Sequence, residues 1–166
     1  MKAAILGNGP SRVSYTNPWQ YDYVLGCNIP WTKVDATIVV DIEVIMHLSK
    51  HPEKITKMYA SANAWRYTDE INKRHLFDGC LLKIIEKNHL GESSAHIAAK
   101  VLIGLGYTEI DIYGCDTKFG TSTTESYTHQ YVNTSNDDQE TAAAKWRKRW
   151  VVMQGAHPEI KFKFIK

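Results

Sequence analysis

The sequence predicts a single α/β domain whose mostly parallel sheet is covered by helices on both faces. Three observations predict it. Short apolar segments rich in β-branched residues alternate along the chain with segments of helical periodicity. The 166 residues fit one domain and contain no internal repeat or low-complexity tract. The apolar and charged fractions, 43% and 23%, are those of an ordinary globular protein.

Seven segments have the composition of strands. The first ends in glycine and the third is rich in β-branched residues, which suits buried parallel strands. We expect strands over residues 2–7, 21–28, 36–41, 57–60, 81–85, 109–114 and 160–165.

The clearest helix is predicted over residues 93–106. Its apolar residues fall on one face at helical spacing. Ser93 or Ser94 can cap its start, and Gly106 can end it. Residues 62–80 mix helical and turn signals, so the sequence leaves their structure open.

Two more helices and one long loop complete the expected domain. A helix over residues 42–51 stops before a proline, and the last helix begins near residue 135 and is closed by Pro158. Acidic residues at its start and basic residues toward its end favour the helix dipole. Residues 117–134 are polar and rich in Thr, Ser and Tyr. Because loops of this length in compact domains are usually functional, we expect an active-site loop there.

Charge and composition exclude several classes of partner. The net charge of +2 is too small to favour nucleic acid or an anionic membrane. No apolar run reaches the ~18 residues that a membrane span needs, and the first residues indicate a strand and not a signal peptide. Cys27, Cys80 and Cys115 lack metal-type spacing and cannot all pair, which favours a reducing compartment. We therefore expect a cytoplasmic protein, and the sequence leaves open whether it is a homo-oligomer.

A glycine-rich turn, residues 7–11, follows the first predicted strand. Its two glycines let the backbone approach a phosphate or ribose closely, and its serine adds a hydroxyl. Arg12 stands where a dinucleotide fingerprint has its third glycine, and Pro10 removes one backbone donor. We expect Asn8 and Gly9 to contact a nucleotide, with an ordinary tight turn as the alternative.

One polar residue follows each of four predicted strands: Asn8, Asn28, Asp41 and Asp116. The carboxyl ends of parallel strands meet at one edge of the sheet, so these residues should converge. An amide both donates and accepts hydrogen bonds, so two asparagines there suit a nucleoside. The alternative is that Asn and Asp are common turn formers after strands.

The start of the clearest helix and the polar loop supply further candidates. Free backbone N–H groups and the hydroxyls of Ser93 and Ser94 make the helix start an anion site, or a plain N-cap. We expect His96, one turn further, on the exposed side of the helix; the alternative is that it faces the site. His129 in the polar loop can act as a general base near neutral pH.

A basic aromatic segment, Lys145 to Trp150, has two interpretations. Aromatic stacking and phosphate contacts would suit RNA or DNA. Trp146 and Trp150 are four residues apart, however, and can lie on the buried face of a helix that exposes its basic residues. We favour this second interpretation, so nucleic acid is not expected as a partner.

Four blocks of the chain together resemble the bacterial lipooligosaccharide sialyltransferases. They are residues 6–11 (LGNGPS), 26–28 (GCN), the Ser93-Ser94 helix start, and 105–116 (LGYTEIDIYGCD). A broader group that includes archaeal 6-hydroxymethylpterin diphosphokinase has the same blocks. The resemblance covers most of the chain and implies a single Rossmann-like domain over residues 1–166. It also implies binding of CMP-sialic acid without a metal.

The resemblance implies a role for each matching residue. Asn8, Gly9 and Ser11 would hold the phosphate and ribose side of the nucleotide, and Asn28 would bind the nucleotide. The other implied contacts are Ser93 and Ser94 with the sugar carboxylate or phosphate, and Gly114 and Asp116 with the cytidine.

The implied catalytic residues lie in the polar loop. His129 matches the catalytic base of the transferases. Lys118 stands where they carry a tyrosine, and could neutralise a leaving phosphate. Asp41 stands where they carry a second nucleotide-binding asparagine; an acid there repels phosphate unless a cation intervenes, which favours the metal-using diphosphokinases.

The sequence therefore predicts a transferase of the sialyltransferase type that binds a nucleotide sugar, with CMP-sugar favoured and no further cofactor. Two alternatives stay open. One is diphosphate transfer from ATP, with Asp41 and Asp116 holding Mg²⁺. The other is a non-catalytic module that binds or sequesters a nucleotide.

Overall fold

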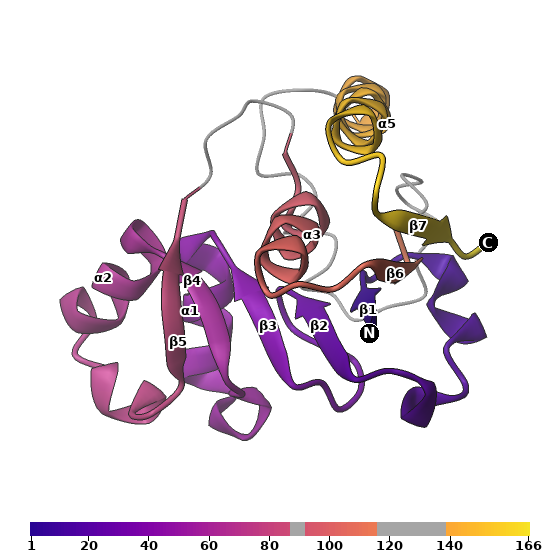
Figure 1. Ribbon diagram of the computed structural model, residues 1–166. Coiled ribbons are helices and arrows are strands. Elements are labelled where there is room, and N and C mark those ends of the chain that lie inside the picture. The colour runs from indigo at the N-terminus through magenta and orange to yellow at the C-terminus, as the bar shows by residue number, and fades with distance from the viewer. Residues whose placement is uncertain (87–91, 116–138) are drawn as a thin grey trace.

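Seven parallel strands form one open sheet, in the order β5-β4-β3-β2-β1-β6-β7 (Figure 1). The computed structural model describes residues 1–86, 92–115 and 139–166, with the backbone alone for residues 139–143. The sheet confirms the predicted α/β class. Its strands are β1 (Lys2–Leu6), β2 (Tyr23–Cys27), β3 (Ala36–Val39), β4 (Met58–Ser61), β5 (Leu81–Ile85), β6 (Glu109–Tyr113) and β7 (Lys161–Phe164).

Four α-helices lie within the described residues: α1 (Ile42–Lys50), α2 (Ala62–Glu70), α3 (Ser94–Gly104) and α5 (Gln139–Ala156). The ambiguous stretch 62–80 forms α2 and a short 3₁₀ turn, Arg74–Phe77. Ser61 caps α2 by accepting a hydrogen bond from the Ala64 N–H at 3.1 Å. The predicted start of the last helix, near residue 135, lies outside the described residues. No described helix is both long and apolar enough to span a membrane.

Different elements pack on the two faces of the sheet. Alternate residues of each strand point to opposite faces, so Ala3 and Ile5 pack under α3 and α5, whereas Ala4 and Leu6 face the other side. In Figure 1, α3 lies in front of the sheet and α1 behind it. Helices α1 and α2 cover the half of the second face that β3, β4 and β5 form. Helices thus cover both faces, as the sequence predicts.

An aromatic cluster covers the rest of the second face, over β1 and β6. The rings of Tyr15, Tyr21 and Tyr113 pack together with centroids 5.3–6.2 Å apart. The Tyr21 hydroxyl donates to the buried Asp111 carboxylate at 2.6 Å, and Lys2 pairs with the same carboxylate at 3.1 Å. Burial, then this hydrogen bond, raise the pKa of Tyr21. Tyrosines contributed by the segment after the glycine turn therefore cover β1 and β6 where a helix would otherwise lie.

The strand order reverses between β1 and β6. The chain builds outward from β1 to β5, then returns to place β6 on the free side of β1. Open α/β sheets bind ligands at such a switch point, beyond the carboxyl ends of the strands. Here Gly7 and Gly114 follow β1 and β6 directly, and their backbones nearly touch. A Cβ on Gly7 would lie 2.5 Å from the Gly114 carbonyl oxygen.

This contact predicts a large stability cost for Gly114→Ala. Gly114 has φ +69°, and an added Cβ would collide with the Gly7 carbonyl. The strained backbone alone costs about 1–3 kcal/mol. We expect chemical denaturation to show at least that loss. Gly155→Ala in α5 is the matched control, because nothing lies within 4 Å of its added Cβ. It should raise stability by up to ~1 kcal/mol. Equal stability of the two variants would contradict the prediction.

Candidate functional site

The glycine turn is tied to the end of β6 by three hydrogen bonds. The Gly7 N–H donates to the Tyr113 carbonyl at 2.7 Å, and the Gly9 N–H donates to the Gly114 carbonyl at 2.8 Å. In return, the Gly114 N–H donates to the Ser11 hydroxyl at 2.8 Å. Ser11 is buried, with 7% of its surface exposed, so its hydroxyl helps hold the turn against β6.

Gly9 differs from Gly7 and Gly114 because its backbone does not require glycine. Its φ of −76° and ψ of 173° are extended values that any residue can adopt. Gly9 is half-buried and directly precedes the short 3₁₀ turn Pro10–Ser14. A side chain at this position would therefore change the surface of the turn and leave its backbone geometry available.

Three predicted site residues lie together beside this turn. The Asn8 side-chain amide donates to the Cys27 carbonyl at 3.2 Å, which ties the turn to the end of β2. The next residue, Asn28, is buried and has the left-handed φ of 63°. Its side-chain oxygen accepts from the Ser94 hydroxyl at 2.9 Å. The ends of β1 and β2 and the start of α3 thus meet through Asn8, Asn28 and Ser94.

The start of α3 is a capping box. Ser93 is the N-cap; its hydroxyl accepts from the backbone at the third helical position, and its own N–H donates to His96 Nδ1 at 2.9 Å. The hydroxyl of Ser93 also lies 2.8 Å from the same ring nitrogen. Ser93 is therefore occupied with capping. The helix leaves the N–H groups of Ser94 and Ala95 without an intrahelical partner, which makes them the donors available to an anion.

The expectation that His96 is exposed is wrong. His96 is 0% exposed, and its Nε2 lies 3.1 Å from the Trp146 carbonyl in α5. Because Nδ1 accepts from the Ser93 N–H, the ring proton is on Nε2 and is donated to Trp146. The Trp150 ring packs against the imidazole with centroids 4.2 Å apart. Helical position alone had placed this histidine in solvent; α5, fifty residues later in the chain, covers it.

Burial keeps His96 neutral. Desolvation lowers the pKa of His96 to about 4, against smaller opposing effects from the Trp146 carbonyl and Glu92. Arg149 and Lys100 also face this cluster and lower the pKa further. His96 therefore acts as a fixed hydrogen-bonding link between α3 and α5 at neutral pH.

A buried carboxylate, which the sequence did not reveal, strengthens this link. The Glu92 side chain is fully buried and pairs with Lys100 of α3 at 2.9 Å and with Arg149 of α5 at 3.3 Å. Its second oxygen, Oε2, has no partner among the described residues. No local pattern marks Glu92, because its two cations lie eight and fifty-seven positions away.

The segment Lys145 to Trp150 lies in α5, and its burial follows the interpretation of a helix that buries its tryptophans and exposes its basic residues. Trp150 is buried in the core under α5, and Trp146 is half-buried. Lys145, Arg147 and Lys148 are exposed on the outer side of the helix. The two tryptophans thus anchor α5 to the rest of the domain.

Asp41 follows β3, the strand next to β2, at the same carboxyl edge of the sheet as Asn8 and Asn28. Asp41 is the N-cap residue of α1, after β3, and is half-buried. Within residues 1–86, 92–115 and 139–166, no three His, Cys, Asp or Glu side chains are grouped to hold a metal ion. Asp116, Lys118, His129 and the expected active-site loop 117–134 lie outside the described residues.

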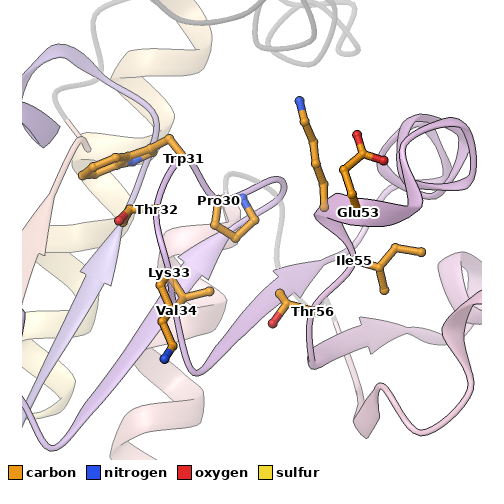
Figure 2. A pocket seen from close by; sticks show the side chains of 9 residues that line it. Pro30, Trp31, Thr32, Lys33, Val34, Glu53, Ile55 and Thr56 are labelled. Atoms are coloured by element: carbon orange, nitrogen blue, oxygen red, sulfur yellow. The ribbon is translucent and has the colours of Figure 1, made fainter.

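A groove of about 380 Å³ lies elsewhere on the molecule (Figure 2). Residues 30–34, in the crossover from β2 to β3, form one wall, and residues 53–56, which precede β4, form the other. Figure 2 shows Trp31 and Glu53 on these two separate segments. The groove includes none of the predicted site residues. It touches the glycine turn only through Trp31, whose indole N–H donates to the Gly7 carbonyl at 3.1 Å.

Comparison with known proteins identifies the fold. No protein-family model matches the chain, and no curated protein sequence does. Among solved structures, the sialyltransferase CST-II in complex with a trisaccharide acceptor and CMP is similar, with a TM-score of 0.53. The alignment covers 99% of this chain and 81% of that chain at 17% sequence identity. The chain therefore has a sialyltransferase-like, Rossmann-like fold.

Burial of His96 predicts a specific acid sensitivity. Its folded pKa of about 4 lies below its ordinary value of 6.5, so the unfolded chain binds the extra proton first as pH falls. Stability is therefore full above pH ~6.5 and is lost progressively as pH falls toward 4, by on the order of 3 kcal/mol. His96→Gln retains a capping-box residue and should lack this loss. Urea unfolding between pH 4 and 7 measures it; identical pH dependence in both proteins would contradict the assignment.

Proposed function

We propose that this protein is a glycosyltransferase of the sialyltransferase type that binds a nucleotide sugar, a CMP-sugar by preference, at the carboxyl edge of its sheet. One observation carries the proposal. Asn8, Asn28 and Ser94 converge beside the glycine turn at the switch point of the sheet. The fold is shared with a sialyltransferase whose structure contains CMP. Neutral amides and hydroxyls at such an edge suit a nucleoside.

The proposed binding roles follow from the places of these residues in the fold and from the resemblance to the sialyltransferases. The Asn8 and Asn28 side chains would meet the ribose or base, and Gly9 would pass close to the ribose or phosphate. Ser94 and the free N–H groups at the start of α3 would bind the phosphate or the sugar carboxylate, with the helix dipole favouring negative charge. Ser11 and Ser93 would act by holding the turn and the helix start. Gly114 and Asp116 would line the cytidine.

The proposed chemistry depends on the segment between β6 and α5. His129 would take the proton from the acceptor hydroxyl as it attacks the donor sugar. Lys118 and the helix start would stabilise the negative charge on the departing nucleotide phosphate. In this proposal the reaction needs no metal and no cofactor beyond the nucleotide sugar.

A panel of nucleotides tests the binding proposal. Thermal unfolding would be followed with CMP, CDP, UDP, GDP and ATP, each with Mg²⁺ or with EDTA. A ligand at 100 times its dissociation constant adds about 2.7 kcal/mol of stability. We expect CMP to give the largest shift, and EDTA to leave it unchanged. A shift with ATP alone that EDTA abolishes would instead support diphosphate transfer with Asp41 as a metal ligand.

Asn28→Gly should weaken CMP binding without unfolding the protein. Glycine retains the left-handed backbone at residue 28 and removes only the amide side chain. Loss of a buried hydrogen-bonding partner costs about 1–3 kcal/mol, so affinity should fall roughly tenfold or more. Asn72→Gly is a matched control, because Asn72 also has a positive φ but follows α2. Isothermal titration measures both variants; unchanged affinity in Asn28→Gly would remove Asn28 from the site.

His129→Ala should separate catalysis from binding. A general base contributes roughly 10²–10⁴-fold in rate and little to ground-state affinity. We therefore expect CMP affinity near that of the wild type, with hydrolysis or transfer of a CMP-sugar reduced by that factor. The wild-type rate should rise with pH through ~6.5.

His75→Ala, which changes an exposed histidine before β5, serves as the control and should retain the wild-type rate. Equal rates in His129→Ala and the wild type would remove His129 from catalysis. Binding of CMP without turnover in any of these proteins would favour the non-catalytic module.

A further inference from the structure

Two cysteines flank the glycine turn on the same face of the sheet. Cys27 ends β2 and is buried, while Cys115 follows Gly114 and is partly exposed. Both pack into the core cluster under α3. Between their strands lies β1, and the register that pairs Leu6 with Gly26 places Gly7 beside Cys27. The two thiols therefore lie on either side of a residue that has no side chain.

The absence of a side chain on Gly7 opens the space between the two thiols. A Cβ on Gly7 would lie 2.8 Å from Cys115 Sγ, so this sulfur lies directly over Gly7. Gly114 has a positive φ, and after it the chain places the Cys115 sulfur over Gly7, at the end of β1. Each thiol thus borders Gly7: that of Cys115 lies over it, and Cys27 lies beside it at the end of β2.

We propose that Cys27 and Cys115 are an oxidation-sensitive pair. A peroxide-class oxidant converts them to a disulfide across Gly7, and this disulfide prevents nucleotide binding at the site. Hydrogen bonds link the turn to Cys27 itself and to Gly114, the residue before Cys115. The Cys27 carbonyl accepts from Asn8, and the residue before Cys115 exchanges two hydrogen bonds with Gly9 and Ser11. A covalent bridge over Gly7 therefore constrains Asn8 and Gly9 and covers the backbone that a nucleotide would approach.

The chemistry proceeds in two balanced steps. Cys115, the partly exposed thiol, reacts first with hydrogen peroxide and gives a sulfenic acid and one water. The Cys27 sulfur then attacks the Cys115 sulfur; the S–S bond forms, the S–O bond breaks, and the hydroxyl leaves with the thiol proton as a second water. The two thiols lose two electrons to the peroxide. Burial raises the pKa of Cys27, which is consistent with its role as the second thiol to react.

Peptide mapping under non-reducing conditions tests the pair directly. The full-length protein would be treated with hydrogen peroxide, digested and analysed by mass spectrometry. We expect a Cys27–Cys115 cross-linked peptide that dithiothreitol removes. Cys80 provides the internal control. It is also partly exposed, but it precedes β5, an outermost strand of the sheet that is separated from β1 by three other strands. Absence of the Cys27–Cys115 peptide, or cross-links to Cys80 in equal amount, would overturn the proposal.

The effect on the site, which rests on the proposed function, is measured by CMP titration of the same samples. Oxidation should weaken CMP binding at least tenfold in the wild type and in Cys80→Ser, and dithiothreitol should restore it. Cys115→Ser should show the same affinity before and after peroxide. A cross-link that leaves CMP affinity unchanged would overturn the regulatory role. If the reduced wild type binds no CMP, the proposed function fails, while the mapping still decides whether the pair exists.

Discussion

The close contact between the ends of β1 and β6 is the constraint on which the candidate site depends. The Gly7 and Gly114 backbones approach so closely that neither position has room for a Cβ. The hydrogen bonds of Gly9 and Ser11 to Gly114 hold the turn in this place. With the turn fixed, the Asn8 amide reaches the Cys27 carbonyl at the end of β2, directly before Asn28. The arrangement of the polar groups thus follows from two glycines at the switch point.

A second set of interactions holds α5 on the face of the sheet that α3 also covers. His96 and Glu92 lie at the start of α3, and both bond to groups of α5, Trp146 and Arg149. Breaking a buried charge pair is costly because the remaining charge stays unpaired in the interior, so Glu92 makes any other position of α5 unfavourable. The start of α3 therefore has two functions. It presents free N–H groups toward the turn, and it determines where the chain resumes after the segment that carries His129.

Local sequence patterns were sufficient to predict the strands of the sheet, because strands such as β1 and β6 are short apolar runs followed by glycine. They also predicted that Asn8 and Asn28 share one edge of the sheet, because the carboxyl ends of parallel strands lie together. Local patterns failed to predict the burial of residues that are covered by elements distant in the sequence. His96 has the sequence context of an exposed helical residue, and only α5 buries it. Nor did local patterns show that the Ser11 hydroxyl accepts from Gly114, a residue 103 positions away. The tyrosine cluster under β1 was missed for the same reason.

The distribution of charge bears on how this edge could recognise an anion. The cations that α3 and α5 bring together, Lys100 and Arg149, are both paired with Glu92, and the Arg12 guanidinium lies over the Trp31 ring at 5.5 Å. In the proposed function, recognition at the start of α3 would therefore rest on backbone N–H groups, the Ser94 hydroxyl and the helix dipole. Fixed dipoles at a partly buried site are screened less by salt than exposed charges are. Under the proposed function, such a site would select a ligand by its shape and hydrogen-bonding groups more than by its total charge, which suits a nucleotide that bears a single phosphodiester.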